Sequence, residues 1–507
     1  MLEIKNLNIK IQNTIIVENL SFTLNEGDKL AIIGEEGNGK STILKAILND
    51  AYYATVTGII NYKNSKIGYL KQNLEENELE KDGFSYLFNN QEDYYQKINE
   101  FYRYLKKINL QEGILTRKLK SLSGGEKVKI SLLKLFLDDV DIFFLDEPTN
   151  DLDLETLLFL ENFLQQTSKP LLYVSHDEML LSKTANMILH LERVKDKKEA
   201  RHTIKRIGYE EYIKERLHHL EKEKQIARNE KREYQKKEAI LRKHLEKVAY
   251  YQETITRSDP HGGRLLKKKM HALKSQEKKL QNEKPREEIA VLENINFFFE
   301  PVFIPKSKRV LKIQLAKLQV ENKILSKNIN FEVIGPLKVG IIGKNGVGKT
   351  TFLKEIFTTL KMRSDLKVGY MPQVYEEVLN NYSNAIDFLT KDKTKESLTK
   401  SRMYLGNMNF TREEMNLEIS KLSNGSKAKL CLLELLLSKY NVLLLDEPTR
   451  NMSPLANPII RTALKEFQGA IISISHDRKY LQEVMDEIYL LDELGLRKIE
   501  KRDLEMD

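Results

Sequence analysis

The feature that most constrains this chain of 507 residues is an internal duplication. An apolar run, a glycine-rich loop and a helix-like segment occur as LAIIGEEGNGKSTILKAIL from residue 30 and as KVGIIGKNGVGKTTFLKEIF from residue 338. Three later landmarks recur 300 residues apart: Ser123 and Ser423, Asp146 and Asp446, His176 and His476. The same landmarks in the same order indicate two copies of one domain, because chance matches do not keep a constant spacing.

Both glycine loops have the Walker A pattern GxxxxGK[ST] between a strand and a helix. In this context backbone N–H groups and the helix N-terminus bind phosphates, the lysine reaches the β/γ-phosphates, and the hydroxyl holds Mg²⁺. We therefore predict one nucleotide site on each copy. The predicted loop contacts are Gly34, Gly37, Asn38, Gly39, Lys40, Ser41 and Thr42, and in copy two Gly343, Asn345, Gly346, Gly348, Lys349, Thr350 and Thr351.

Two apolar runs, DIFFLDE and VLLLDE, are typical of buried parallel strands that end in acidic residues. The glutamates that follow, Glu147 and Glu447, are placed to polarise an attacking water, and His176 and His476 to lie near the γ-phosphate. These four are the predicted catalytic residues. The predicted metal-site residues are Ser41, Gln72, Asp146, Thr350, Gln373 and Asp446. Strand caps and structural histidines would not explain five such elements in the same order twice.

Together with LSGGE at residues 122–126, this set of motifs resembles the ATP-binding cassette superfamily, and the resemblance covers nearly the whole chain apart from its middle. It implies ATP and Mg²⁺ as ligands and two cassettes that close head to tail within one chain. The signature of each copy would then contact the nucleotide held by the other. The predicted signature contacts are Ser123, Gly124, Gly125, Glu126, Ser423, Asn424 and Gly425, beside the Q-loop glutamines Gln72 and Gln373.

The second copy departs from this pattern. Its signature reads LSNGS, and its segment RNMS replaces the NDLD that follows the Walker B strand of copy one. Both changes affect the site built on Lys40, so we predict that the site with Lys349, Asp446 and Glu447 hydrolyses ATP faster. The family commonly stacks adenine on an aromatic residue, and Ile11 and Val320 stand at the positions that align with it.

Positive charge is concentrated in one segment. Residues 214–286 hold 22 Lys/Arg and 11 Asp/Glu, whereas the net charge of the whole chain is +9. Apolar residues at Leu241, Leu245 and Val248 step by four and three, and those at Leu266, Met270, Leu273 and Leu280 follow the same period. We predict two antiparallel helices joined at a tip of about residues 254–263. Some 40 helical residues would span about 60 Å.

This segment could be a solvated spacer, as charged helical runs usually are. The excess of cations and the aromatic pair Tyr250 and Tyr251 favour RNA as a partner, because cations neutralise phosphates and aromatic rings stack on bases. The residues predicted to contact RNA are Tyr250, Tyr251, Arg257, His261, Arg264, Lys267, Lys268 and Lys269.

The fold class we predict is α/β, with two tandem nucleotide-binding domains and a helical hairpin linker. The expected boundaries are 1–192 for domain one, with a short arm insertion between Lys40 and Gln72, 193–295 for the linker, and 296–507 for domain two. The single cysteine, Cys431, excludes a disulfide framework and a multi-cysteine zinc site. It fits a reducing compartment, and no apolar run reaches 18 residues, so we expect a cytoplasmic protein without a membrane partner. The closure of two cassettes within one chain, which the resemblance implies, would make it a monomer.

Two cassettes in one chain with a basic hairpin between them resemble the ABC-F proteins. The resemblance implies a ribosome-binding ATPase of the E site whose linker reaches toward P-site tRNA and 23S rRNA. The short arm and divergent second half are similar to the antibiotic-resistance branch, which displaces lincosamides, pleuromutilins or streptogramin A. One alternative is a housekeeping translation factor that acts on stalled ribosomes. Another is a fused twin ATPase of a membrane importer, whose cassettes would be joined by a short link.

Overall fold

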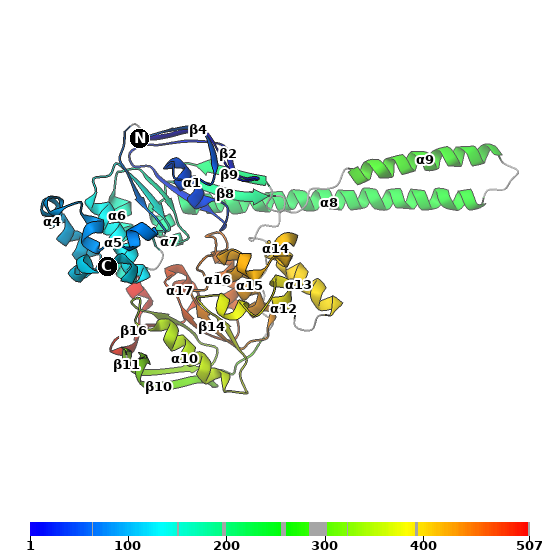
Figure 1. Ribbon diagram of the computed structural model, residues 1–507. Helices are drawn as coiled ribbons and strands as arrows, with labels where there is room; N and C mark the ends of the chain where they lie inside the picture. Colours follow the sequence, from blue (N-terminus) through cyan, green and yellow to red (C-terminus); the bar gives the residue numbers. More distant parts are fainter. Residues whose placement is uncertain are drawn as a thin grey trace. The chain divides into compact units, whose positions relative to one another are not determined.

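The structure is a computed structural model of the full chain, and it describes residues 1–62, 64–72, 74–149, 152–194, 199–254, 260–282, 302–321, 323–390 and 394–504. The chain divides into two compact units (Figure 1). One unit comprises Met1–Glu210 with Val291–Asp507 and contains both cassettes, and the other comprises Glu211–Ala290.

Copy one alternates strands and helices in the order expected for a parallel α/β sheet. Its strands are β1 Leu2–Ile11, β2 Thr14–Leu24, β3 Lys29–Gly34, β4 Thr55–Asn61, β5 Ile67–Leu70, β6 Ile142–Asp146, β7 Leu171–Val174, β8 Met187–Val194 and β9 Glu199–Lys205. Its helices are α1 Lys40–Ile47, α2 Glu76–Leu79, α3 Gly83–Leu87, α4 Gln91–Lys107, α5 Gly124–Leu137, α6 Leu154–Gln166 and α7 Glu178–Thr184, with short 3₁₀ turns η1 Glu112–Thr116 and η2 Leu119–Ser121.

Copy two repeats this series. Its strands are β10 Arg309–Val320, β11 Lys323–Ile334, β12 Lys338–Ile342, β13 Val368–Met371, β14 Val442–Asp446, β15 Ala470–Ile474, β16 Glu487–Asp492 and β17 Gly495–Ile499. Its helices are α10 Lys349–Lys361, α11 Glu376–Leu379, α12 Ala385–Leu389, α13 Lys395–Asn407, α14 Arg412–Asn416, α15 Asn424–Leu437, α16 Asn457–Glu466 and α17 Arg478–Val484, with 3₁₀ turns η4 Ile419–Lys421 and η5 Lys501–Leu504.

The two large sheets have the same topology. Their strand orders are β5-β6-β7-β3-β8-β9 and β13-β14-β15-β12-β16-β17, and only the last strand of each runs antiparallel. Every residue of β3, β6 and β7 is buried, as is every residue of β14 and β15. Such runs need cover on both faces, so the sheets form the cores and the loops at the strand ends carry the polar motifs. The predicted α/β class with two tandem domains is confirmed.

Two details differ from expectation. The stretch between Lys40 and Gln72 is eight residues longer than its counterpart in copy two and contains strand β4, which pairs with β1 in a sheet of order β2-β1-β4, where we expected a short arm. The corresponding sheet of copy two contains β10 and β11. Strand β9 pairs with β8 and extends the first domain past the boundary expected at residue 192. The strand was not predicted because its sequence, EARHTIK, is charged, as an exposed edge of a sheet allows.

The second unit contains most of helix α8, Tyr209–Thr254, and helix α9, Pro260–Asn282. At 46 residues α8 is longer than we predicted and spans about 69 Å. The expected tip was too long at its second end, because Pro260–Gly263 already belong to α9. Proline is tolerated in the first helical turn, where its missing N–H has no partner to lose. Val248 and Leu273, both in the predicted apolar series, are buried.

Candidate nucleotide-binding sites

The two glycine loops have matching backbones. Gly34, Gly37 and Gly39 have φ angles of 147°, 82° and 90°, and their counterparts in copy two have 155°, 80° and 97°. A Cβ atom on Gly34 would lie 2.4 Å from the carbonyl oxygen of Leu191, so the loop requires glycine there. The third glycine is the N-cap of α1 or α10, which directs free N–H groups of the helix into the loop.

Each loop lysine is held above its own loop. Nζ of Lys40 donates to the carbonyl oxygens of Gly34 and Glu35 at 3.0 and 3.2 Å. Nζ of Lys349 makes the same bonds to Gly343 and Lys344, at 2.7 and 3.1 Å. Burial lowers the pKa of both lysines, while nearby carboxylates raise it. The arrangement leaves a buried ammonium group at the mouth of each loop, where an anionic phosphate would lie.

A hydroxyl and a carboxylate meet beside each loop, as a Mg²⁺ site would require. Oγ of Ser41 donates to Oδ1 of Asp146 at 3.0 Å, and Thr350 bonds Asp446 in the same way. Among the described residues, Oδ2 of Asp446 is buried without a hydrogen-bond partner. Burial raises the pKa of Asp446 to about 6. A divalent cation would supply the missing partner for this oxygen, so these side chains fit Mg²⁺.

The residue after each Walker B aspartate has an unusual backbone. Glu147 and Glu447 have φ angles of 52° and 55°, in the left-handed region that bulky residues rarely adopt. Their amides donate to Val174 and Ile474 of the neighbouring strand at 3.0 and 2.9 Å. Left-handed residues of this kind gather at functional sites, where the surrounding structure holds the strain. Both glutamates are thereby turned into the same position relative to their sheet.

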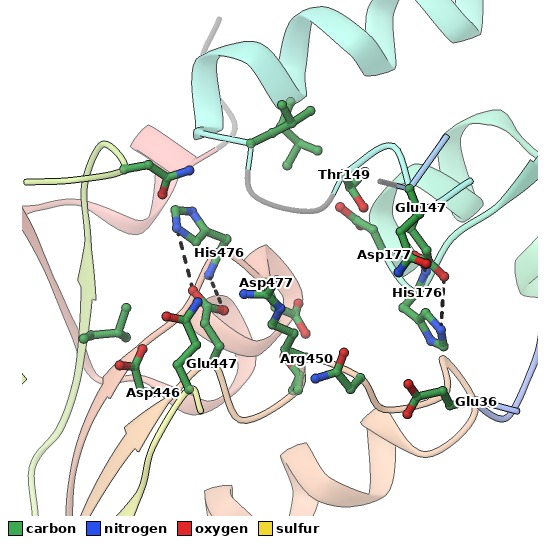
Figure 2. Close-up of a pocket in the computed structure, with 18 of the residues that line it drawn as sticks. Glu36, Glu147, Thr149, His176, Asp177, Asp446, Glu447, Arg450, His476 and Asp477 are labelled. Atoms are coloured by element: carbon green, nitrogen blue, oxygen red, sulfur yellow. Dashed lines mark hydrogen bonds and ion pairs between the residues drawn. The ribbon is translucent and has the colours of Figure 1, made fainter. Parts of the chain in front are cut away.

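Each of these glutamates contacts the predicted histidine of its own copy, and Figure 2 shows the two pairs on opposite sides of one cavity. The backbone amide of His176 donates to Oε2 of Glu147 at 3.2 Å, and Nε2 of the His176 ring lies 3.1 Å from Oε1 of Glu147. The corresponding distances for His476 and Glu447 are 3.2 and 3.7 Å. Burial raises the pKa of both glutamates to about 7 and lowers that of His176 to about 3.

The cavity has a volume of about 660 Å³ and is lined by both copies. The predicted residues that line it are Gly37, Gly39, Lys40, Ser41, Thr42, Gln72, Glu147 and His176, and in copy two Asn345, Gly346, Gly348, Lys349, Thr350, Thr351, Gln373, Asp446, Glu447 and His476. Of the two residues aligned with the adenine contact, Ile11 lines the cavity. Val320 is 46 % exposed, and Leu325 lines the cavity instead.

The signatures begin helices α5 and α15. Ser123 caps α5 by accepting from the Glu126 amide at 3.3 Å, and Ser423 caps α15 by accepting from Ser426 at 3.1 Å. The carboxylate of Glu126 accepts from the Ser123 amide at 2.8 Å, which completes a capping box that Ser426 cannot form. Glu126 therefore has a helix-capping role that the sequence did not suggest, beside the nucleotide contact that we predicted for it.

One signature meets the phosphate loop of the other copy. The Gly425 amide of α15 donates to the Glu36 carboxylate of copy one, and Glu36 lies at the edge of the cavity near His176 (Figure 2). Beside it, Nζ of Lys429 lies 3.3 Å from Oε1 of Glu35. A Cβ atom on Gly425 would be 2.7 Å from the Glu36 carboxylate, so the two surfaces are in close contact. Copy two thus packs its signature against the Lys40 loop.

Two buried ion pairs also join the copies. Arg461 on α16 donates to both oxygens of Glu178, the first residue of α7, at 2.5 and 3.2 Å. Arg478, the first residue of α17, forms a second bidentate pair with Glu161 on α6. The four side chains are at most 5 % exposed. Positions 161 and 461 correspond in the repeat, as do 178 and 478, so each pair is the counterpart of the other with opposite charge on opposite copies.

The four residues of the two buried ion pairs, Glu161, Glu178, Arg461 and Arg478, form a clasp between the copies. Sequence inspection missed these clasp residues and Glu36. The signal was present in the repeat. Aligning the copies at an offset of 300 sets glutamate against arginine at both clasp positions, and an offset of 309 sets Glu36 against Asn345.

The predicted RNA contacts lie on the helical unit. Tyr250 and Tyr251 are 63 % and 48 % exposed near the end of α8, with ring centroids 6.0 Å apart. Arg264, Lys267, Lys268 and Lys269 are exposed on α9. Arg257 lies outside the described residues, and His261 belongs to α9. In the described part of the chain, no helix has the length and apolar character that a membrane span needs.

The fold and the paired loops define an ATP-binding protein, and the comparisons agree. The family model described as "ABC transporter" matches residues 17–150 and 326–450, which together make up half of the chain. The chain therefore belongs to the ABC transporter family and carries an ABC ATPase domain in each half.

Full-length relatives support this assignment. The ATP-binding protein Uup of Buchnera aphidicola subsp. Acyrthosiphon pisum (strain APS) is 27% identical over 513 residues, 98% of this chain and 81% of Uup. The ribosome protection protein VmlR of Bacillus subtilis (strain 168) is 28% identical over 513 residues, 97% of this chain and 87% of VmlR. The archaeal ribosome recycling factor aABCE1, solved with the stalk protein aP1, shares the fold with a TM-score of 0.60, 17% identity, and coverage of 97% and 89%.

Proposed function

We propose that this chain is an ABC-F protein, an ATPase that binds the ribosome in the cytoplasm and acts through its basic hairpin. The observation that carries the proposal is the hairpin itself, which joins two cassettes within one chain and holds 22 of the 83 Lys/Arg residues in its span 214–286. The similarity to VmlR over 97% of the chain supports it, since that relative is named a ribosome protection protein.

The surface of the hairpin suits a structured RNA. Its exposed cations near the start of α9, Arg264 and Lys267–Lys269, can neutralise phosphates, and exposed Tyr250 and Tyr251 can stack on bases. A coiled-coil spacer would need only the buried series that includes Val248 and Leu273. We propose 23S rRNA near the E site and P-site tRNA as the partners, and a monomer whose two cassettes close on each other.

In the proposed mechanism, ATP at each phosphate loop is held by the loop amides and by Lys40 or Lys349. Mg²⁺, held by Ser41 with Asp146 or by Thr350 with Asp446, would neutralise phosphate charge. Glu147 and Glu447 then orient and polarise the attacking water, and the paired histidine fixes each carboxylate. The ATP-closed form fits the E site, the hairpin displaces a bound drug or shifts the tRNA, and hydrolysis reopens the cassettes.

The hairpin also has a contact at its root through which closure could act on it. The Tyr209 hydroxyl, on the first residue of α8, donates to the carbonyl oxygen of Pro454 at 3.3 Å, and both residues lie in the cassette unit. Pro454 belongs to the segment that follows the Walker B strand of copy two. A movement of that segment on ATP binding would therefore reach the start of α8.

A charge-neutralising variant tests the proposed partner. In a co-sedimentation assay with ribosomes and a non-hydrolysable ATP analogue, replacing Lys267, Lys268 and Lys269 by glutamine should weaken binding on the order of tenfold or more. The matched control replaces Lys231, Lys236 and Lys237 by glutamine, three exposed lysines in the middle of α8. Equal losses in both variants, or no loss in either, would remove the support for RNA contact near the start of α9.

Two roles on the ribosome need separate tests. Expression in a susceptible host, followed by lincosamides, pleuromutilins and streptogramin A, should give resistance that the double Glu147→Gln, Glu447→Gln variant lacks. The alternative, a translation factor for stalled ribosomes, uses the same ATP sites and the same hairpin. It predicts unchanged drug sensitivity and a defect in translation of stalling sequences when the gene is removed. A twin ATPase of an importer would instead co-purify with a membrane permease.

A further inference from the structure

The Lys40 site contains an acid that the other site lacks. Glu36 is the third residue of the loop GEEGNGKS, and the matching residue of GKNGVGKT is Asn345. The Glu36 carboxylate accepts the hydrogen bond of the Gly425 amide, the second residue of helix α15. An amide in the first turn of a helix has no partner within the helix and prefers an anion.

The surroundings of Glu36 are also those of a phosphate. Burial raises the pKa of this carboxyl, whereas the Gly425 hydrogen bond and the ammonium groups of Lys40, Lys429 and Lys427 lower it. Burial lowers the pKa of Lys40, the residue that would hold the β/γ-phosphates, and the carboxylates of Glu147 and Glu36 oppose this shift. Glu36 therefore lies between the lysine of one copy and the signature amide of the other, where the γ-phosphate would lie if this signature closed on ATP as the family resemblance implies.

We propose that Glu36 determines the nucleotide specificity of the Lys40 site, because its carboxylate competes with the γ-phosphate of ATP for the signature of copy two. The inference rests on the proposed ATP site at Lys40. ADP has no γ-phosphate and does not meet this competition, so the Lys40 site distinguishes ATP from ADP less than the Lys349 site does. Without nucleotide, the same contact keeps the Gly425 end of α15 on the loop.

The test uses the full chain with Lys349→Ala, so that the Lys40 site alone reports. Equilibrium titration with fluorescent ATP and ADP analogues, the former non-hydrolysable, gives the ratio of the two dissociation constants. Glu36→Asn, which borrows the residue of copy two, should shift this ratio about tenfold toward ATP, the size of one charge-assisted hydrogen bond. In the reciprocal background, Lys40→Ala, the change Asn345→Glu should shift the ratio of the Lys349 site toward ADP.

Glu35→Gln is the matched control, because it removes one charge from the adjacent residue and breaks the pair with Lys429 but leaves the Gly425 contact. It should leave the ratio within about twofold. An unchanged ratio in Glu36→Asn, or an equal shift in Glu35→Gln, would overturn the specificity role. If the Lys349→Ala chain with native Glu36 binds neither nucleotide, the proposed Lys40 site fails, and the inference fails with it. Binding at the Lys349 site in a Glu36→Asn chain checks folding.

Discussion

The clasp predicts a measurable coupling between the two cassettes. Replacing Arg478 by methionine removes two hydrogen bonds to the buried Glu161 carboxylate, which is 2 % exposed. Losing one partner of a buried pair typically costs 3–5 kcal/mol. Lys183 remains 2.9 Å from Glu161 and is partly exposed, so it offsets part of the loss. We therefore expect about 3 kcal/mol, the lower end of that range.

Amide hydrogen exchange measures this loss where it occurs. A change of about 3 kcal/mol in the opening free energy raises exchange on the order of 100-fold. The reporters are the protected amides of α17 and the segment after it, such as those of Leu481 and Met485. The control is Lys498→Met, which breaks a pair with Glu487 on β16 whose lysine is 56 % exposed. An exposed pair is worth about 0–1 kcal/mol, so this control should change exchange less than about fivefold.

The double variant Glu161→Gln, Arg478→Met separates charge from packing. Removing both charges leaves no isolated buried carboxylate, so the double variant should exchange more slowly than Arg478→Met alone. If the double variant instead exchanged faster than Arg478→Met, by the product of the separate effects of Glu161→Gln and Arg478→Met, the two residues would act independently and the clasp would be refuted. The charges also oppose wrong pairing, because two first copies would place Glu161 against Glu178.

Two further predictions concern the ATP sites. ATP turnover should fall more in Glu447→Gln than in Glu147→Gln, each losing up to about 100-fold of its own site's rate, because the intact signature of copy one would complete the Glu447 site in the proposed closed form. A larger loss from Glu147→Gln would reverse the ranking. Gly343 has a φ angle of 155°, and in Gly343→Ala the Cβ atom would lie 2.3 Å from the Leu491 carbonyl oxygen. Thermal melting should show that the free energy of unfolding falls by about 1–3 kcal/mol. Gly346→Ala should lower the free energy of unfolding less, because φ is 80° there and the added Cβ atom would lie in open space.

Much of the architecture followed from the sequence, because motifs with fixed neighbours constrain both ends of a strand or helix. The runs before Asp146 and Asp446 are strands β6 and β14, and the loop lysines begin α1 and α10. The apolar series of the linker is buried at Val248 and Leu273. Edge strands such as β9 were harder to recognise, since one face and one edge are open to solvent and the residues need not be apolar.

Within each copy the site followed from local pattern, whereas between the copies only the meeting of a signature with the opposite phosphate loop was expected, from the family resemblance. Residues that act through their own loop, such as Lys40 with Gly34, follow from local pattern. Contacts between the copies depend on which surfaces meet, and no local period encodes that. Glu36 and the clasp residues became visible as partners only when the fold placed α15 against the loop and α17 against α6. Comparing the two copies position by position would have identified them as candidates.

The most direct test of the account is whether ATP holds this chain on ribosomes. The double Glu147→Gln, Glu447→Gln variant, incubated with ATP and purified ribosomes and centrifuged through a sucrose cushion, should pellet with the ribosomes in near-stoichiometric amount. The same variant with ADP, or with Lys40 and Lys349 replaced by alanine, should remain in the supernatant. A double variant that binds ATP and still sediments free of ribosomes would contradict the proposed function and leave the paired ATPase domains in place.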